Sequence, residues 1–577
     1  MGRTISIGEQ GFEYLIKKNY FYIDKTEFIK QWWDNGDSVT LITRPRRFGK
    51  TLNMDMLNCF FSNRYAGRSD IFEQLNIWKY EEFRKLQGTY PVIFLTFADI
   101  KGRDLNIAKK QIKKQLSDVF ISYKEILQEY EYTENEINLF NNVSENMDDA
   151  TAGYSLKSLS NMLAQRYEKK VLIFLDEYDT PLQEAYLGGY WDEMVSFIRS
   201  LFNSTFKTNP AMERGLMTGV TRVSKESIFS DLNNLEVITT TSEKYSTSFG
   251  FTEKETFEAL EEQGFSKEDK ANVKKWYDGF TFGKSADIYN PWSITKYLDS
   301  GELKAHWANT SSNGLIGRLI QQSDKNIKTT FEDLLDGKEI KKEIDEEIVF
   351  NQLSENVDAI WSLLLASGYL RVVSYTNPAV DKVGQEGETD PAEYTLVLTN
   401  LEVKSMMQKL IKGWFKKNSS YRDFISAMLS GNVREMNYYM NQVALATFSS
   451  FDSGNHPSEA TEPERFYHGF VLGLMVDRRE DYIIRSNRES GFGRYDVIME
   501  PRNIYSSGSL PGIILEFKIY DEEYDGEKNL SDTADNAIKQ INEKHYETDL
   551  LEKGLPAEKI LKYGFAFQGK KVLIKKA

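Results

Sequence analysis

Four short, almost uninterrupted apolar runs punctuate the N-terminal part of the chain. Such runs predict strands buried on both faces, as in a parallel sheet. The segments between them carry apolar residues at helical spacing. The predicted strands cover residues 39–42, 91–97, 170–179 and 214–222, and the predicted helices cover residues 52–57, 104–130, 134–167 and 193–206. This alternation predicts an α/β fold, a parallel sheet with helices on both faces.

The pattern changes beyond residue 252. Residues 253–440 predict mainly helices, and a Pro-, Ser- and Gly-rich stretch at 452–463 predicts a linker. The remaining chain predicts helices at 464–477 and 531–543 and strands at 482–487, 494–499, 512–519, 563–567 and 571–574. This is the pattern of a second, smaller α/β domain. We expect three domains, at residues 1–285, 286–450 and 451–577.

Composition narrows the class of protein. The 577 residues carry a net charge of −15, with 40% hydrophobic and 28% charged residues, as in soluble globular proteins. The charge argues against a basic protein that coats nucleic acid. A single cysteine, Cys59, excludes an intramolecular disulfide framework, and four scattered histidines argue against a zinc site. With no signal sequence and no apolar run long enough to span a membrane, we expect a cytoplasmic protein without membrane contact.

The first candidate site is the loop of residues 43–51, which joins a predicted strand to a predicted helix. It ends in Gly49-Lys50-Thr51, as a phosphate-binding loop requires. Backbone N–H groups would surround the phosphates, Lys50 would reach the β- and γ-phosphates, and Thr51 would ligate Mg²⁺. Arg44 stands where that pattern has its first glycine. The alternative is a basic loop that only caps a helix.

Polar residues follow two other predicted strands, and ligands of α/β sheets bind at such carboxyl ends. Asp176 could hold Mg²⁺ together with Thr51, and Glu177 could polarise the attacking water. Arg222 could contact the γ-phosphate as a sensor. The alternatives are that Asp176 and Glu177 only face solvent and that Arg222 is a surface arginine.

The first 285 residues resemble the bacterial AAA-ATPase-like family of P-loop NTPases, which is close to the archaeal and STAND-type ATPases. The resemblance rests on residues 22–26, 44–51, 174–179 and 219–225. The family has R-P-R-R-F-G-K-[ST] in its loop, which makes Arg44 a family trait and the loop a basic variant of the phosphate cradle. It implies an ATP-binding α/β core followed by a helical or winged-helix region. The implied nucleotide-binding residues are Arg46, Arg47, Phe48, Gly49, Lys50, Thr51, Asp176 and Arg222.

The second candidate site lies on two predicted strands near the C-terminus. Glu516 and Lys518 are two residues apart, so both side chains point to one face of their strand. Asp496 lies among apolar neighbours on the preceding strand. Two carboxylates on adjacent strands can share Mg²⁺ or Mn²⁺, and the lysine can hold or deprotonate the water that attacks a phosphodiester.

This pattern resembles the PD-(D/E)xK nuclease superfamily over about the last 115 residues, and the flanks 486–496 and 514–518 support the resemblance. It implies that Asp496, Glu516 and Lys518 are catalytic and that Glu464 is an additional metal ligand. It also implies a role for Gln540, with Tyr546 as a further candidate, in the later helix motif. The alternative is an internal Glu516–Lys518 ion pair beside a solvated Asp496.

Together the two resemblances imply an ATP-binding and ATP-hydrolysing protein whose nucleotide state controls a Mg²⁺-dependent nuclease. DNA is the expected substrate and RNA the alternative, with a role in defence or mobile-element control by analogy. The rival is a non-catalytic platform in which nucleotide drives oligomerisation and the nuclease fold only binds nucleic acid or protein. The −15 charge favours this rival, whereas the intact acids and Lys518 favour the enzyme. A plain ATPase or motor would need an arginine from a second subunit.

Overall fold

The computed structural model describes residues 2–222, 228–229, 232–307, 316–317, 319–320, 325–345, 359–377, 392–415, 420–447, 478, 481–490, 493–503, 510–520, 527–568 and 571–577. The chain forms two compact units, residues 1–316 with 336–405 and residues 317–335 with 406–577. Each unit is described by itself. Within the described residues, no helix is long and apolar enough to cross a lipid bilayer.

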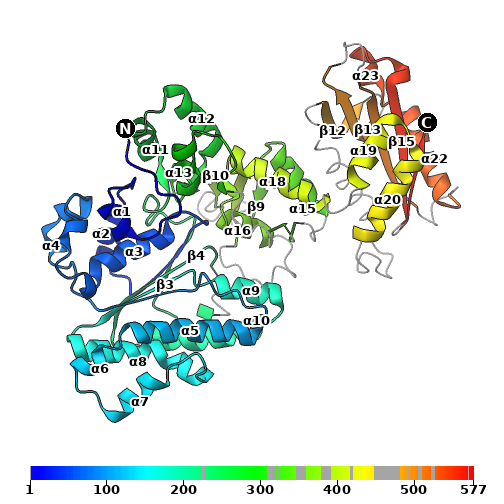
Figure 1. Cartoon of the computed structure of the whole chain (residues 1–577). Helices are drawn as coiled ribbons and strands as arrows, with labels where there is room; N and C mark the ends of the chain where they lie inside the picture. The colour runs from blue at the N-terminus through cyan, green and yellow to red at the C-terminus, as the bar shows by residue number, and fades with distance from the viewer. Residues whose placement is uncertain are drawn as a thin grey trace, which may run out of the picture. The chain divides into compact units, whose positions relative to one another are not determined.

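A five-stranded parallel sheet forms the centre of the first unit (Figure 1). Its strand order is β2-β3-β4-β1-β5, and every neighbouring pair is parallel. The four predicted strands are confirmed. The strands are β1 (Val39–Thr43), β2 (Val92–Thr96), β3 (Val171–Asp176), β4 (Met212–Gly219) and β5 (Leu235–Ile238). The short edge strand β5 was not predicted, because its four residues include a glutamate and give too little pattern.

Helices cover both faces of this sheet, as predicted (Figure 1). Ile173 and Leu175 of β3 join the core on one face, and Leu172 and Phe174 join the core on the other. The first face is covered by α5 (Leu105–Ser122), α8 (Asp149–Tyr167) and α10 (Trp191–Phe202), and the second by α2 (Glu27–Asn35) and α3 (Lys50–Phe61). The alternating side chains of a strand buried on both sides account for its continuous apolar run.

The three longest predicted helices of this unit differ in extent from the structure. The segment 104–130 contains α5 and the short α6 (Ile126–Glu129), and 134–167 contains α7 (Glu134–Asn142) and α8. The segment breaks between α7 and α8 because the Asp148 side chain accepts from Thr151 N and starts a new helix. The third helix, α10, is followed by a π-helical turn at Asn203–Lys207. Helix α9 (Thr180–Gly188), which follows β3 directly, was not predicted.

The rest of the first unit contains helices and two small antiparallel sheets. The first sheet consists of β6 (Phe251–Thr252), β7 (Phe280–Phe282) and β8 (Ser285–Tyr289), and the second of β9 (Ile340–Lys342), β10 (Leu370–Thr376) and β11 (Glu393–Leu398). The helices include α11 (Glu253–Glu262), α12 (Lys267–Tyr277), α13 (Pro291–Ser300), α16 (Ala359–Ala366) and the start of α18 (Leu401–Phe415). Besides the predicted helices, this region thus contributes short strands, of which β7 packs against Phe48 of the phosphate loop.

The second unit is built on a mixed sheet of order β12-β13-β14-β15-β16. All neighbours are antiparallel except β14 and β15. Its predicted elements are confirmed as β12 (Tyr482–Ser490), β13 (Gly493–Pro501), β14 (Gly512–Ile519), α22 (Leu530–Glu543), β15 (Ile560–Gln568) and β16 (Lys571–Lys576). The predicted linker 452–463 and helix 464–477, with Glu464, lie outside the described residues.

Two helices before the predicted linker also belong to this second unit, as do α15 (Lys325–Leu335) and the later part of α18. Met428 of α19 (Ser420–Ser430) and Met436 of α20 (Val433–Thr447) share a core with Val497, Leu515 and Phe565 of the sheet. Helix α20 also covers the edge strand β16. Asn437 and Asn441 each donate to one backbone carbonyl and accept from one backbone N–H of Ile574 and Val572, at 2.7–3.0 Å. These amides replace the neighbouring strand that an edge strand lacks.

The asparagine contacts predict a local stability effect. Asn437→Ala removes two hydrogen bonds to Ile574, so β16 is expected to open more easily by about 1–3 kcal/mol. Hydrogen exchange of the peptide that spans β16, measured by mass spectrometry on the full chain, checks this. Glu435→Gln, on the exposed side of α20, is the matched control. Equal exchange in both variants would show that the amides do not hold the edge.

Candidate nucleotide and nuclease sites

The loop of residues 44–49 leaves β1 and turns into α3 at the carboxyl edge of the parallel sheet. Gly49 adopts a left-handed conformation, with φ of 81°, and is the N-cap residue of α3. The Lys50 side chain is buried, and its ammonium donates to the carbonyls of Arg44 and Pro45 at 2.9 and 3.0 Å. Burial lowers the pKa of Lys50. The N-terminus of α3 and the Lys50 ammonium therefore lie at one place, as an anion site requires.

Arg44 occupies a different place from the one its sequence position suggests. Its side chain is fully buried, and its guanidinium donates to the carbonyls of Thr43 and Thr239 and lies 4.5 Å from the ring centroid of Phe282. Burial lowers the pKa of Arg44 to about 9, so it stays charged at neutral pH. Arg44 is not among the residues that line the adjoining pocket. It anchors the loop from behind, which corrects the expectation of a basic cradle at this position.

Thr51 and Asp176 meet across the edge of the sheet. The Thr51 hydroxyl donates to Asp176 Oδ2 at 2.7 Å, and the Thr218 hydroxyl donates to Asp176 Oδ1. Thr218 lies on β4, between β1 and β3, and was not predicted. The Asp176 side chain is 1% exposed. Hydroxyl and carboxylate oxygens in contact are the donor set of a hard cation, so these residues fit Mg²⁺.

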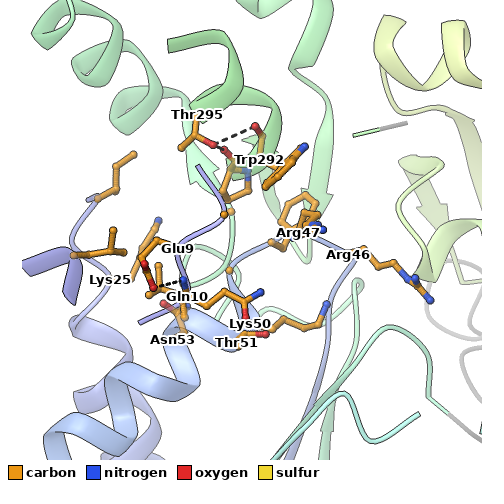
Figure 2. Close-up of a pocket in the computed structure, with 18 of the residues that line it drawn as sticks. Glu9, Gln10, Lys25, Arg46, Arg47, Lys50, Thr51, Asn53, Trp292 and Thr295 are labelled. Carbon is orange, nitrogen blue, oxygen red and sulfur yellow. Dashed lines mark hydrogen bonds between the residues drawn. The ribbon is translucent and has the colours of Figure 1, made fainter. Parts of the chain in front are cut away.

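Glu177 follows Asp176 with a left-handed backbone, at φ of 51°, a conformation that non-glycine residues seldom adopt. Its side chain accepts from Thr180 at 3.2 Å and lines the pocket beside the loop. The turn thus directs Glu177 to the same space as Lys50 and Thr51 (Figure 2 shows these two). Arg222 lies three residues beyond the end of β4, half-buried, and is not among the residues that line this pocket.

The remaining predicted loop residues point in three directions. Arg47, with φ of 65°, lies 4.5 Å from the ring centroid of Trp292, whereas Arg46 points away from Lys50 (Figure 2). The Arg46 guanidinium donates to Gln183 of α9 at 2.9 Å. Phe48 is buried against two rings of β7, Phe280 and Phe282. These side chains therefore brace the loop against its surroundings as well as bordering the pocket.

Asp179 is a buried residue near this site to which the sequence assigned no role. Its Oδ2 atom accepts from the backbone N–H groups of Val220 and Thr221, from the Thr221 hydroxyl and from Gln183, each at 3.0 Å. Gln183 in turn accepts from Arg46. Asp179 thus connects the phosphate loop to the end of β4, the segment that leads to Arg222.

The pocket beside the loop has a volume of about 380 Å³ and is bordered by parts of the chain that the motif does not include (Figure 2). They include residues within 6–10, 21–25, 98–101 and 248–251 and the start of α13. A cavity of this size, with cationic and apolar borders, suits a small phosphorylated ligand. Residues 22–26 belong to the family resemblance, but the sequence could not have assigned the other segments to this pocket, because their short polar and aromatic stretches carry no spacing signal.

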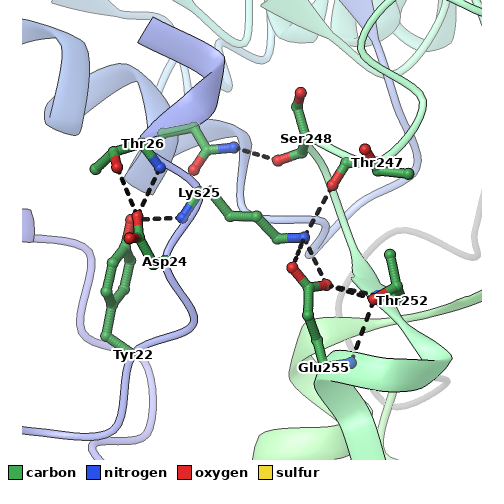
Figure 3. A network of polar contacts seen from close by, with 9 residues as sticks. Tyr22, Asp24, Lys25, Thr26, Thr247, Ser248, Thr252 and Glu255 are labelled. Carbon is green, nitrogen blue, oxygen red and sulfur yellow. Dashed lines mark hydrogen bonds and ion pairs between the residues drawn. The ribbon is translucent and has the colours of Figure 1, made fainter. Parts of the chain in front are cut away.

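The 22–26 motif holds two of these segments together (Figure 3). The buried Lys25 ammonium donates to both oxygens of Glu255 at 2.7–2.8 Å and to the Thr247 carbonyl at 2.8 Å. Asp24 accepts from Thr26 N and from Asn76 N. Glu255 also belongs to the capping box of α11. The motif therefore fixes the N-terminal segment to the residues that follow the sheet.

In the second unit, the predicted acids lie on the face of the sheet covered by α22. The register of β13 and β14 pairs Val497 with Leu515, so its continuation sets Asp496 opposite Glu516. Asp496 accepts from Phe517 N at 2.8 Å. The buried Glu516 accepts from the Gln540 amide of α22, which also donates to the Tyr546 hydroxyl at 3.1 Å. Four candidate residues from the sequence therefore lie close together: Asp496, Glu516, Gln540 and Tyr546.

A glycine allows this arrangement. Gly564 pairs with Glu516, and a Cβ atom there would lie 2.5 Å from the Ala534 carbonyl of α22. Helix α22 can therefore lie close enough for Gln540 to reach the strand. Burial raises the pKa of Tyr546, and the charges of Glu516 and Asp496 raise it further. Lys518 follows two residues after Glu516 on the same strand, half-buried. Two carboxylates with an amide and a lysine beside them fit a divalent cation and a water molecule.

Comparison with known proteins agrees with both halves of this description. Residues 6–229 match the model of a family described as predicted AAA-ATPase. Residues 462–577 match the model of the PD-(D/E)XK nuclease superfamily. The chain therefore carries an AAA-ATPase-like domain and a C-terminal PD-(D/E)XK nuclease-superfamily domain. These are domain types of ATPases and of nucleases. The Lys50, Thr51, Asp176 and Glu177 group lies within the first match, and the Asp496, Glu516 and Gln540 group within the second.

One similar curated protein comes from Azotobacter chroococcum mcd 1 and bears the description "Uncharacterized protein in vnfD 5'region". It is 26% identical over 322 residues, and the match covers 56% of this chain and 56% of that protein. The similarity therefore spans only about half of either chain.

Part of the surroundings of the pocket beside the phosphate loop lies beyond the AAA-ATPase-like match. Pocket residues 248–251 and 291–295 follow it in sequence, as do Trp307 and Glu402. Glu402, the second residue of α18, is fully buried and accepts from Trp307 N and from the Ser293 hydroxyl, both at 2.7 Å. Burial raises the pKa of Glu402 to about 7 despite these hydrogen bonds.

Glu402 predicts a pH dependence for the unit that contains the AAA-ATPase-like domain. Because the folded-state pKa lies above the ordinary glutamate value, the folded chain holds this proton more tightly than the unfolded chain. The stabilisation is complete below about pH 4.3 and is lost as the pH rises through about 7, a change of about 4 kcal/mol. The neighbouring titratable groups are Tyr277 and His306, whose pKa values burial raises and lowers, respectively.

Urea unfolding at pH 5 and pH 8, followed by tryptophan fluorescence, checks this expectation. Glu402→Gln removes the titration and can keep both hydrogen bonds. The stability of this variant relative to the parent should therefore rise from pH 5 to pH 8. The same difference at both pH values would show that Glu402 is ionised in the folded protein throughout this range.

Proposed function

We propose that the protein binds and hydrolyses ATP in its first unit, and that the nucleotide state controls Mg²⁺-dependent cleavage of DNA by its C-terminal domain. A role in defence or in the control of mobile elements is proposed by analogy with similar architectures. The observation that carries the ATPase half is the 2.7 Å hydrogen bond between Thr51 and Asp176 beside the Lys50 ammonium. This hydrogen bond joins the phosphate loop to the acidic end of β3 at the carboxyl edge of the sheet.

In this proposal each residue of the first site has a defined task. Lys50 exchanges its two loop carbonyls for phosphate oxygens. Thr51 and Asp176 hold Mg²⁺, which neutralises phosphate charge when bound. Glu177 orients the attacking water, and Arg222 senses the γ-phosphate from the segment that Asp179 holds. Gly49 allows the phosphates to approach the backbone N–H groups of the loop.

The nuclease half rests on two observations. Asp496 and Glu516 lie opposite one another on neighbouring strands, and Gln540 donates to Glu516. The two carboxylates, with Glu464, would hold Mg²⁺ or Mn²⁺, which stabilises negative charge on the phosphodiester when bound. Lys518 would hold or deprotonate the attacking water, and Gln540 keeps Glu516 oriented. Because the chain is acidic overall, these metal ions and local cations would have to offset the repulsion of a polyanionic substrate.

One set of assays tests both halves. The full chain is incubated with single- and double-stranded DNA and RNA, with Mg²⁺ or Mn²⁺, and with or without ATP, while phosphate release is followed in the same tubes. We expect metal-dependent cleavage of DNA that changes with ATP. Absence of cleavage under every condition would overturn the nuclease half and favour a nucleotide-switched binding platform. Cleavage that is indifferent to ATP would overturn the proposed control.

A further inference from the structure

The carbonyl of Arg46, in the middle of the phosphate loop, receives two hydrogen bonds from a distant part of the chain. The Trp307 indole donates to it at 3.1 Å, and Asn290 Nδ2 donates to it at 3.3 Å. Asn290 is also the N-cap residue of α13 and accepts from the backbone N–H groups of Trp292 and Ser293. The two donors are thus fixed to one another through the segment 290–307.

Glu402 holds this segment from behind. One carboxylate oxygen accepts from the Trp307 backbone and the other from the Ser293 hydroxyl, each at 2.7 Å. The Glu402, Ser293 and Asn290 side chains are completely buried, and Trp307 is 4% exposed. The hydrogen bonds join these groups directly, and a buried carboxylate is costly unless such donors compensate it. From the start of α18, Glu402 therefore holds both Ser293 and Trp307 of the 290–307 segment.

The three consecutive loop carbonyls are held from two different parts of the chain. Lys50 binds the carbonyls of Arg44 and Pro45, whereas the carbonyl of Arg46 is bound from the 290–307 segment. In the proposed function Lys50 must leave its two carbonyls to reach phosphate. The bonds to Arg46 then remain as the fixed point of the loop. They also precede the left-handed Arg47, at which the loop turns.

We propose that Glu402 is a positioning residue for nucleotide binding, which acts through Trp307 and the Arg46 carbonyl to keep the phosphate loop in its binding conformation. This inference rests on the proposed ATP binding and deepens it.

The test measures the Kd of ADP and of a non-hydrolysable ATP analogue for the full chain, at a temperature where circular dichroism shows each variant folded. Glu402→Ala is expected to weaken binding on the order of tenfold, because Trp307 N and Ser293 lose their acceptor. Glu402→Gln can accept from Trp307 N and donate to Ser293, so it should bind within about twofold of the parent. Tyr132→Phe removes a buried hydrogen bond to the Met162 carbonyl far along the chain and is the matched control.

A double-mutant cycle separates positioning from general stability. Trp307→Phe keeps an aromatic side chain but removes the indole donor to Arg46, and should weaken binding roughly three- to tenfold. If Glu402 acts through Trp307, the double variant binds about as weakly as Glu402→Ala alone. The inference would be overturned if the fold-changes in Kd of the two single variants multiplied in the double variant. It would also be overturned if Glu402→Ala bound nucleotide with parental affinity and only had a lower melting temperature. Nucleotide binding by the parent protein separately tests the proposed function. If the parent does not bind nucleotide, both the proposed function and this inference are wrong.

Discussion

DNA cleavage by an Asp496→Asn variant is expected to fall more than about 100-fold, since even loss of an outer partner of a metal site costs roughly 10–100-fold. The asparagine oxygen can still accept from Phe517 N, so the strands should keep their pairing. What the variant loses is the negative charge that faces Glu516. Metal-dependent cleavage of duplex DNA, measured with Mg²⁺ and with Mn²⁺, checks this, and nucleotide binding should be unchanged.

The companion variant Lys518→Ala should also abolish cleavage, because it removes the group proposed to handle the attacking water, a contribution of roughly 10²–10⁴-fold. Asp535→Asn is the matched control, since this carboxylate lies on the exposed side of α22 and pairs with Lys575. If Asp496→Asn and Lys518→Ala both cut as well as the parent, the nuclease site has been assigned to the wrong residues.

A Lys50→Ala variant is expected to bind ATP roughly 10–100-fold more weakly, the cost of losing charge-assisted hydrogen bonds to phosphate. Cleavage should then no longer respond to ATP at concentrations that saturate the parent. Titration with a fluorescent nucleotide measures the first effect, and cleavage with and without ATP measures the second. Lys85→Ala, an exposed lysine of the same unit, is the control. An ATP response that survives in Lys50→Ala without binding would refute nucleotide control.

The sequence predicted the elements of the fold well where its signals are local. The apolar runs located β1 to β4, because a strand covered on both faces needs an apolar side chain at nearly every position. It failed where a single residue changes the outcome. Asp148 starts a new helix by accepting from Thr151 N, which divides a segment whose apolar spacing alone predicts one helix. The short β5 lacks a pattern and exists because β1 offers it an edge.

The two sites were predictable to different depths. Thr51 and Asp176, as well as Asp496 and Glu516, stand at the ends or faces of recognisable strands, and parallel or paired strands bring such positions together. The partners that hold them were not predictable. Thr218 reaches Asp176 only because β4 is inserted between β1 and β3, and strand order is not written in local spacing.

By itself, the sequence determined which residues can carry chemistry, since residue type, spacing and strand ends fix charge and face. Only the tertiary structure decided how they are held. It buries Arg44 behind the loop, gives the Arg46 carbonyl to Trp307 and Asn290, and joins Glu402 to Ser293, 109 residues away. The physical reason is that a buried polar group must find a partner, and packing, not proximity along the chain, decides which one is within reach.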